Sequence, residues 1–524
     1  MLAKYLEGYD KVKTDTLLNG FTNGFSLGFE GEKQAFTSPN LKSALEMPSE
    51  VDRKLAKELS LGRLAGPFQS PPLSNFRTSP IGLVPKKVKN TYRVIHHLSY
   101  PKGSSVNDGI PFHKSTVNYA TVDDAIAMIK RVGPGCYLAK TDIESAFSLL
   151  PVDPTDYNLL GFQWNSEFYY SKVMPMGGSS SCQTFESFST SLEWIAKNKL
   201  NIPNVLHILD DFLFIVKAKS KCQKAVDDFS EFCHISGIPL VLAKTEGPAT
   251  ELPFAGIELD TVRMEARLPP DKIAKCRNQL NLFLKSKKVK LVEIQALIGL
   301  LNFACTVVRP GRPFLRRLID LTIGLKYPAH RRRLTKEVKQ DLLVWSTFLD
   351  NYNGRSFFIS DYFMSSSTLH FYSDASTSHG WGVIFQSHWS YGEWNLEYKS
   401  WNIAILEFYP IVLAVYLWGS VLVNKSVVFH TDNEALVHVI NKQTCKDPKL
   451  MLLLRRLVLK CLELNVVFTA VHIPGLKNIY ADSLSRLQID KFRNASSKLN
   501  MDLHPTPLEP AMRHESFFQP LKRC

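Results

Sequence analysis

The sequence predicts a multidomain α/β protein, and three observations support this prediction. The chain has 524 residues, more than a single domain of roughly 100–200 residues usually needs. Apolar residues make up 45% of it, enough to build packed cores. Two stretches alternate apolar strand-like runs with helical patterns, and a helical, basic stretch separates them. We expect an N-terminal extension (1–70), an α/β domain (71–262), a helical basic region (263–365), a second α/β domain (366–490) and a polar tail (491–524).

The charge balance favours a polyanionic partner. Lys and Arg number 63 against 49 Asp and Glu, which gives a formal charge of +14. Nucleic acid is the simplest partner of this kind, and an acidic membrane surface is the other. The longest apolar run, 408–423, contains Pro410 and is shorter than the ~20 residues of a membrane span, so we expect no membrane partner.

Cysteine use and the first residues favour an intracellular protein, cytoplasmic or nuclear. The nine cysteines include no C-x-x-C pair, so neither a zinc ribbon nor a disulfide framework is predicted. The N-terminal MLAKYLEGYD lacks the apolar core of a secretory signal.

The extension is expected to hold one helix near 48–61, followed by a Pro-rich joint. The first α/β domain then opens with a basic hairpin. In SPIGLVPKKVKNTYRVIHHLS (79–99), two strands flank a turn that brings Lys86 and Arg93 together. Such a hairpin can fold over triphosphate oxygens, although a solvated charged hairpin has the same pattern.

Three aspartates mark the centre of this domain. VLHILDDFLFIV places Asp210 and Asp211 between two apolar runs, as in a tight β-hairpin, and Asp142 ends an upstream apolar strand. Adjacent carboxylates on an apolar hairpin are costly unless a cation neutralises them, although a solvated Asp-Asp turn remains open. Together the three acids predict a Mg²⁺ site. In MPMGGSSSC, Gly177 allows close approach of the backbone to a substrate, and an ordinary turn is the alternative.

The region that follows is predicted to be helical and to bind phosphates. Asp271 can cap a helix through 284, and a second apolar stripe begins at Leu291. Residues 309–339 hold ten basic residues against two acids. Their clustering favours nucleic-acid binding over a merely solvated face. The candidate contacts are Arg309, Arg312, Arg316, Arg317, Arg331, Arg332 and Arg333.

Four acids recur in the second α/β domain at strand ends or early in helices. They are Asp374, Glu407, Asp432 and Asp482. Acids in these places can converge from different elements, and four carboxylates around two Mg²⁺ ions can cut a phosphodiester. Any one of them alone could be a helix cap.

The basic hairpin, the Asp142 strand, the Gly/Ser segment and the I-L-D-D hairpin resemble, in this order, the motifs of retroelement reverse transcriptases. The resemblance implies a right-hand polymerase of fingers, palm and thumb. It implies metal binding by Asp142, Asp210 and Asp211, and triphosphate contacts by Lys86 and Arg93. FAGIELD (254–260) resembles the primer grip, and Lys244 matches a basic residue that often precedes it. The sequence departs from the family at Ile208, Met176 and His97.

Phe147 matches the bulky gate residue of that family. An aromatic ring beneath the sugar leaves no room for a 2′-hydroxyl, so dNTPs would be favoured over NTPs. We therefore expect Phe147 and Gly177 to line a dNTP site.

The order of elements and acids in the second α/β domain resembles ribonuclease H. His472, ten residues before Asp482, matches a loop histidine that assists product release or proton transfer. Three phrases together further resemble DIRS-type retrotransposons: LIGLLNFACTVVRPGRPFLRRL, HIPGLKNIYADSLSRL and GPFQSPPLSNFRTSPIGLVPKK. No protease, integrase or tyrosine recombinase motif accompanies them, so the chain looks like one segment or one reading frame of a longer element.

These resemblances imply an RNA-directed DNA polymerase with ribonuclease H activity. Its partners would be an RNA template, a DNA primer, RNA–DNA hybrid and dNTPs, with other retroelement proteins also conceivable. Its cofactor would be Mg²⁺, two ions per site, with Mn²⁺ as a substitute. Two alternatives remain: a domesticated or decayed element product that binds nucleic acid without catalysis, and a DDE recombinase in place of the ribonuclease H.

Overall fold

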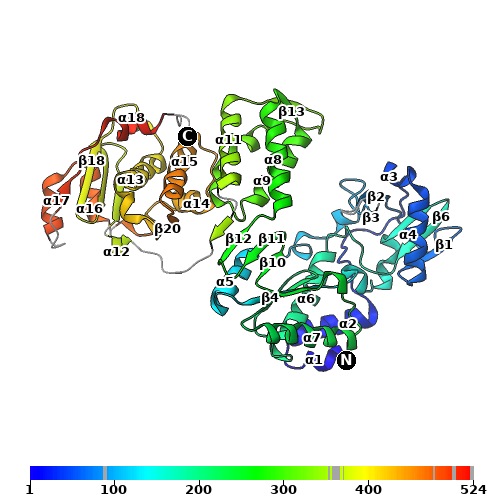
Figure 1. Cartoon of the computed structure of the whole chain (residues 1–524). Coiled ribbons are helices and arrows are strands. Elements are labelled where there is room, and N and C mark those ends of the chain that lie inside the picture. The colour runs from blue at the N-terminus through cyan, green and yellow to red at the C-terminus, as the bar shows by residue number, and fades with distance from the viewer. Residues whose placement is uncertain are drawn as a thin grey trace. The chain divides into compact units, whose positions relative to one another are not determined.

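The computed structural model describes residues 1–85, 91–351, 354–356, 366–369, 371–475, 478–497 and 503–519 (Figure 1). The chain divides into two compact units, Met1–Met264 and Glu265–Cys524. Both units combine helices with sheets, which confirms the predicted multidomain α/β class.

A four-stranded antiparallel sheet in the order β7-β8-β4-β9 forms the centre of the first unit. Side chains alternate along β8, so Phe212 and Phe214 share a core with α6 and α7 while Leu213 and Ile215 are buried on the opposite face. These elements are β4 (Tyr137–Asp142), α6 (Ser181–Asn198), β7 (Val205–Ile208), β8 (Asp211–Val216), α7 (Lys219–Ile235) and β9 (Glu246–Ala249).

The rest of the first unit includes a second, three-stranded sheet in the order β1-β6-β5 and two hairpins, β2–β3 and β10–β11. The helix expected near 48–61 is α4 (Pro48–Ser60), whose Val51 and Leu55 pack with these strands. The elements are α3 (Lys42–Leu45), β1 (Leu64–Phe68), β2 (Ile81–Pro85), β3 (Tyr92–His96), α5 (Val122–Val132), β5 (Gly161–Trp164), β6 (Glu167–Ser171), β10 (Glu251–Phe254) and β11 (Ile257–Asp260).

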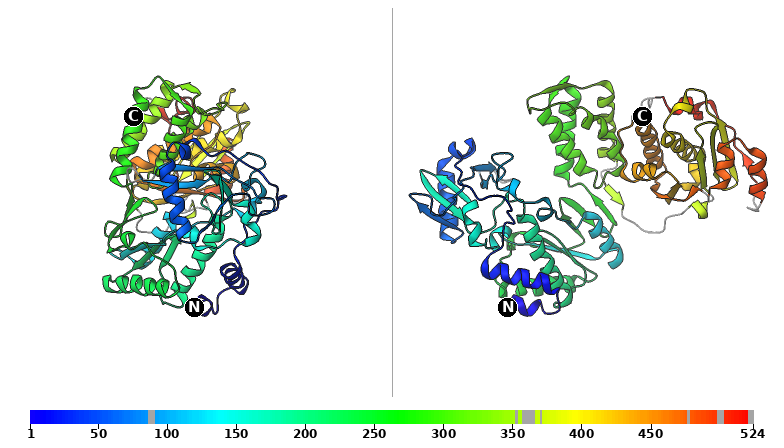
Figure 2. Two further views of the ribbon diagram at one scale, coloured as in Figure 1. Left: turned by 90° about the vertical axis from the view of Figure 1, so that its right-hand side faces the viewer. Right: turned by 180° about the vertical axis from the view of Figure 1, so that it is seen from behind.

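The N-terminal segment is built into the core of this unit rather than attached to it. Helices α1 (Leu2–Tyr5) and α2 (Lys11–Asn23) pack against α6 and α7 (Figure 2). Tyr5 meets Phe232 edge to face at 4.8 Å. Phe25, 5% exposed, donates its N–H to the carbonyl of Pro151 at 2.8 Å. The N–H of Leu27 is bound by the carboxylate of Asp156 at 2.9 Å. Residues 1–27 are therefore part of the folded unit.

The second unit begins with a helical region, residues 270–351. Its long helices are α8 (Pro270–Lys285), α9 (Leu291–Ala304) and α11 (Lys336–Asn351), with shorter η6 (Arg309–Phe314) and α10 (Arg316–Asp320). A two-stranded ribbon pairs β13 (Lys288–Lys290) with β14 (Arg331–Arg333). Strand β13 connects α8 to α9, and β14 precedes α11. Strands β12 (Glu265–Arg267) and β15 (Gly354–Ser356) form a separate antiparallel pair. The helices expected from Asp271 and Leu291 are present as α8 and α9.

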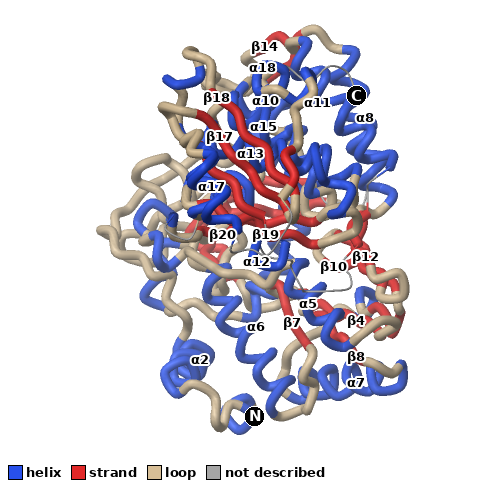
Figure 3. The backbone as a smooth tube through the Cα atoms, turned by 90° about the vertical axis from the view of Figure 1, so that its left-hand side faces the viewer, coloured by secondary structure: helices blue, strands red, loops and turns tan. Residues whose placement is uncertain are grey.

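Residues 371–519 form the C-terminal α/β domain. Antiparallel β16, β17 and β18 lie side by side, and β19 pairs in parallel with β20 (Figure 3). Val383 and Phe385 face α13 and α15, whereas Ile384 faces α16 and α17 on the other side. The elements are α12 (Ser366–Leu369), β16 (Phe371–Ala375), β17 (Gly380–Phe385), β18 (His388–Glu393), α13 (Ile403–Trp418), β19 (Ser426–Thr431), α14 (Glu434–Lys442), α15 (Pro448–Glu463), β20 (Val467–His472), α16 (Ile479–Ser485) and α17 (Ile489–Ser496).

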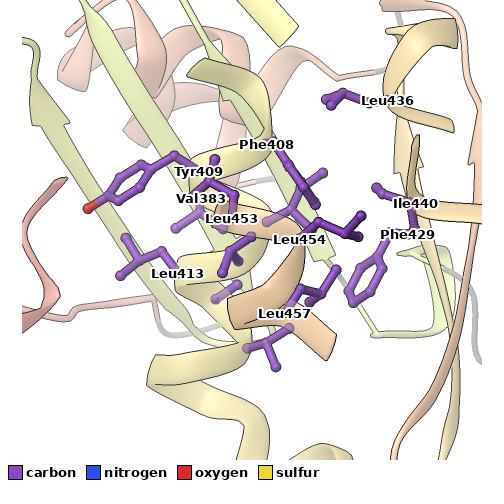
Figure 4. Close-up of a cluster of buried hydrophobic side chains, with 14 of the residues drawn as sticks. Val383, Phe408, Tyr409, Leu413, Phe429, Leu436, Ile440, Leu453, Leu454 and Leu457 are labelled. Atoms are coloured by element: carbon purple, nitrogen blue, oxygen red, sulfur yellow. The ribbon is translucent and has the colours of Figure 1, made fainter. Parts of the chain in front are cut away.

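Helix α13 is apolar around its circumference except at Glu407, because the domain buries it. Phe408, Tyr409 and Leu413 pack against Leu453 and Leu457 of α15 (Figure 4). The segment Ile403–Leu422 is long and apolar enough to cross a membrane by length and composition, but 72% of it is buried inside the domain. It is a core helix, as an apolar helix without a polar face usually is in a globular protein.

The expected polar tail, 491–524, differs from what the structure shows. Phe492 is buried in α17, and residues 504–505 form β21 (His504–Pro505), which extends the sheet beside β18. Helix α18 (His514–Phe517) places Phe517 in the main core, where Arg456 binds its carbonyl at 2.8 Å. The described part of this segment therefore belongs to the C-terminal domain. Single apolar residues among polar ones gave too weak a pattern to predict it.

A buried ion pair joins this domain to the helical region. Arg455 of α15 is 5% exposed and contacts the carboxylate of Asp341 on α11 at 2.9 Å and the carbonyl of Pro313. Arg317 binds the other carboxylate oxygen at 2.7 Å. Burial raises the pKa of Asp341 to about 6 despite both guanidinium groups, and it lowers that of Arg455 to about 10. Desolvation thus costs more than the pairing returns.

Arg455→Met is expected to destabilise the second unit by about 3–5 kcal/mol, because Asp341 stays buried and keeps only Arg317 as a cationic partner. Arg455→Met combined with Asp341→Leu should recover most of this loss, since no buried charge remains. Urea denaturation of both variants and the wild type measures the difference. Equal stability of the single variant and the wild type would contradict the assignment.

Candidate active sites

The three aspartates of the first unit meet at one end of its central sheet. Asp142 ends β4, Asp211 begins β8, and the two are direct cross-strand partners. Such partners have Cα atoms about 4.5–5.5 Å apart. Asp210 lies in the two-residue turn that joins β7 to β8. The other turn residue, Leu209, has φ +54°. The carbonyl of Asp210 accepts the N–H of Ile143 at 3.0 Å, which ties the turn to the end of β4.

The environment of these carboxylates is poor in water and close to one cation. Asp142 is 7% exposed, and both its oxygens accept hydrogen bonds from the Lys244 ammonium at 2.8 Å. Burial, followed by the charges of neighbouring aspartates, raises the pKa values of Asp210 and Asp211. A cluster of acids that is both buried and mutually repulsive favours binding of a cation.

The residues expected to bind the triphosphate and to form the gate differ in their burial and backbone conformation. Gly177 has φ +111°, and a Cβ there would lie 2.9 Å from the carbonyl of His96, so the position requires glycine. Phe147 is half-buried and meets Phe185 edge to face at 5.6 Å. Arg93 is exposed on β3 opposite Val84. Lys86 lies outside the described residues.

A buried charge cluster between β7 and α6 was not predicted from the sequence. His207 of β7 is 5% exposed. Its Nδ1 lies 2.5 Å from Oε2 of Glu193, and its Nε2 lies 3.2 Å from Oε1 of Glu186. Burial alone would lower the pKa of His207, but the two carboxylates raise it to about 9. The imidazolium thus clamps β7 to α6 three residues before Asp210. The one signal in the sequence is the spacing of Glu186 and Glu193, which are seven residues apart and therefore lie on one face of α6.

Because the pKa of His207 is raised, its charged form stabilises the folded state. This contribution to the free energy of unfolding is fully present below the unfolded pKa of about 6.5 and is lost as pH rises through about 9. It amounts to at most about 3 kcal/mol. His207→Gln is expected to increase hydrogen exchange of residues 181–208 at pH 6, and the difference from wild type should vanish near pH 10. Differences that do not depend on pH would refute the charged clamp.

The four acids of the C-terminal domain are brought together by two strands and two helices. Asp374 is the fourth residue of β16, Glu407 lies on α13, Asp432 follows β19, and Asp482 lies on α16. Burial raises the pKa of Asp374 to about 6; the Ser485 hydroxyl, donating at 2.5 Å, opposes the rise, and the charges of Asp432 and Asp482 add to it. The site therefore concentrates negative charge at the sheet end.

Among the described residues, Glu407 is the acid of this site that lacks a neutralising partner. Its Oε2 is buried without a hydrogen-bond partner. Burial and the Asp432 charge raise its pKa to about 8, against a hydrogen bond from Asn433. At the other side, the exposed Arg486 pairs with Asp482 at 2.7 Å.

The backbone just after β20 approaches one of these acids. A Cβ at Gly475 would lie 2.9 Å from Oδ2 of Asp432, so the backbone approaches the carboxylate closely. Asn478 is buried and donates to the carbonyl of Ser373 at 2.7 Å, which holds the start of α16 beside β16. His472 is exposed at the end of β20, opposite Thr431 and thus next to Asp432.

Both sites suit Mg²⁺ in their chemistry. They offer hard carboxylate oxygens, which Mg²⁺ prefers, and the orphaned Oε2 of Glu407 is a buried acceptor that a cation can satisfy. Within the described ranges, no three His, Cys, Asp or Glu side chains form a preassembled metal-binding group. One acid at each site is instead engaged by a basic side chain, Lys244 or Arg486.

The seven arginines of the basic stretch do not form one surface. Arg316 is ion-paired with Asp320, and Arg317 with Asp341. Arg309 and Arg312 are exposed on η6. Arg331, Arg332 and Arg333 form β14, a location that the helical pattern did not predict.

The fold and the position of the aspartates at a hairpin tip define the class of the first unit, a polymerase palm with fingers, and the C-terminal domain has the element order of ribonuclease H. Residues 70–259 match the family model described as reverse transcriptase (RNA-dependent DNA polymerase). This part of the chain is a reverse transcriptase domain, and the match supports an RNA-directed DNA polymerase.

Solved structures of the foamy viral protease-reverse transcriptase share the fold. The complex with double-stranded DNA matches with a TM-score of 0.51 at 15% identity, covering 90% of this chain and 97% of that chain. The complex with RNA/DNA hybrid gives 0.52 at 14%, covering 91% and 63%. The dRH form with double-stranded DNA gives 0.51 at 16%, covering 87% and 74%. Comparison with curated proteins gives no match.

Proposed function

We propose that the chain is an RNA-directed DNA polymerase that also cleaves the RNA strand of RNA–DNA hybrids. The observation that carries the proposal is the pair of carboxylate clusters, each at the end of a sheet and each partly desolvated. Solved complexes of the similar foamy viral enzyme with double-stranded DNA and RNA/DNA hybrid support nucleic-acid partners.

In the palm, Asp142, Asp210 and Asp211 would hold Mg²⁺, which when bound neutralises the triphosphate and activates the primer 3′-hydroxyl. Lys244 holds Asp142 in place through two hydrogen bonds. Gly177 lets the backbone approach the incoming nucleotide, and Phe147 excludes a 2′-hydroxyl by its bulk. Arg93 and Lys86 would bind triphosphate oxygens.

In the C-terminal domain, Asp374, Glu407, Asp432 and Asp482 are the proposed Mg²⁺ ligands. Ser485 orients Asp374 through its hydroxyl, and Asn478 fixes the neighbouring backbone. His472, exposed beside Asp432, would exchange a proton with water at the site.

The test is a pair of assays on the purified full chain with Mg²⁺: dNTP incorporation on a DNA-primed RNA template, and cleavage of RNA in a labelled hybrid. Activity in both supports the proposal. Hybrid binding without either activity would favour the non-catalytic element product, and strand transfer into DNA without RNA cleavage would favour a DDE recombinase.

We further propose that the chain comes from a DIRS-type retroelement and acts inside the cell, in cytoplasm or nucleus, beside other element proteins. The motifs of residues 297–318 and 472–487 support this. A tyrosine recombinase reading frame next to its gene would support the subclass, and an integrase frame there would overturn it.

A further inference from the structure

The ribbon β13–β14 carries four cations on one face. Its register pairs Lys288 with Arg333, Val289 with Arg332, and Lys290 with Arg331. Side chains of a strand alternate between faces, and cross-strand partners share a face. The four side chains of the first and third pairs therefore lie together, which defines the cationic face: Lys288, Lys290, Arg331 and Arg333.

The opposite face is fixed to the helical region, so the cationic face points outward. Val289 is 4% exposed in the core, and Arg332 donates to the carbonyl of Ile323 at 2.7 Å. The ribbon is closed at both ends, where Leu334 N–H binds the Lys287 carbonyl at 3.0 Å and Leu291 N–H binds that of His330 at 2.7 Å. Of the cationic face, Lys288, Arg331 and Arg333 are exposed and Lys290 is half-buried.

The cationic face has no internal counter-ion. Among the described residues, no carboxylate lies within ion-pair distance of these four side chains, in contrast to Arg316 and Arg317. The nearby Glu293 carboxylate is bound to the backbone N–H of Lys290. Like charges directly opposite in a ladder are destabilising. Two such pairs on a rigidly held ribbon are stabilised when a polyanion bridges them.

We propose that the cationic face is a binding site for the phosphates of duplex nucleic acid, with an RNA–DNA hybrid as its substrate. Successive pairs on a strand face are about 6.8 Å apart, and the long side chains give each pair reach to one or two phosphates. The identity of the duplex rests on the proposed function; the phosphate site itself does not. The site includes Lys288 and Lys290, which lie outside the basic stretch, and excludes Arg316, Arg317 and Arg332.

The test compares the full-length wild type with a variant in which all four residues are changed to Gln. Each lost phosphate contact reduces the slope of log affinity against log salt by about 0.9, so the variant slope should be shallower by about 3–4. The matched control removes four exposed lysines of the first unit, Lys4, Lys11, Lys13 and Lys221, and changes net charge equally. Its slope should stay within about one unit of wild type. Equal slopes for both variants would overturn the proposal.

Two further measurements keep the outcome decisive. Thermal unfolding of the Gln variant should occur at the same or a higher temperature than wild type, because repulsion is removed. A charge-preserving variant, with Lys288 and Lys290 as Arg and Arg331 and Arg333 as Lys, should retain the wild-type slope; its loss would overturn a phosphate role. If the wild type binds hybrid through this face but incorporates no dNTP, the proposed polymerase activity is wrong and the proposed phosphate site stands.

Discussion

Asp210→Asn is expected to reduce dNTP incorporation by more than about 100-fold while leaving hybrid cleavage at the wild-type rate. Changes outside the direct ligands of a metal site typically cost about 10–100-fold, and a direct ligand should cost more. The side chain lies in a turn and shares its site with Asp142 and Asp211. Asn keeps the volume and removes the charge, so the fold should persist. Primer-extension and hybrid-cleavage assays on one preparation measure both activities.

The matched control is Asp227→Asn, an exposed acid on α7 that is bound to Gln223 at 2.9 Å. It changes net charge equally and should leave both activities unchanged. Loss of both activities in Asp210→Asn would point to misfolding, which circular dichroism would reveal. Full synthesis by a folded Asp210→Asn variant would refute the palm site.

Glu407→Gln should have the converse effect: hybrid cleavage falls by more than about 100-fold and DNA synthesis is retained. Gln keeps the volume of the Glu407 side chain and cannot ionise, and the Oε2 that it replaces has no hydrogen-bond partner, so the domain should be no less stable. Glu434→Gln is the control, since Glu434 is exposed in the first turn of α14. Equal cleavage by the Glu407 and Glu434 variants would eliminate the four-acid site.

The sequence predicted the fold class and the clustering of acids because both depend on local patterns. Asp210 and Asp211 lie between two apolar runs, and a two-residue turn between strands is read directly from such a pattern. Asp374 lies near the end of β16 and Asp432 directly follows β19, and the two are close enough for their charges to interact. Short-range periodicity therefore sufficed for the elements that carry the sites.

Contacts between distant residues had no local signal. His207 binds Glu186 and Glu193 only because β7 packs on α6, and Asp341 meets Arg455 across two structural regions. Lys288 faces Arg333 through a ribbon whose strands have three residues each, too short for a period to be read. The local net charge predicted a basic stretch. It could not distinguish the arginines that are ion-paired within the protein from those of the cationic face.

The incorporation of residues 1–27 into the palm core affects how the protein can be synthesised. Tyr5 and Phe25 emerge from the ribosome first, yet their partners Pro151 and Phe232 follow much later. At roughly 5–20 residues per second, the nascent N-terminus carries unburied apolar side chains for ten seconds or more. Translation rate and chaperone supply should therefore govern the soluble yield. A fragment cut at the family boundary, residues 70–259, would leave the same core surface uncovered permanently.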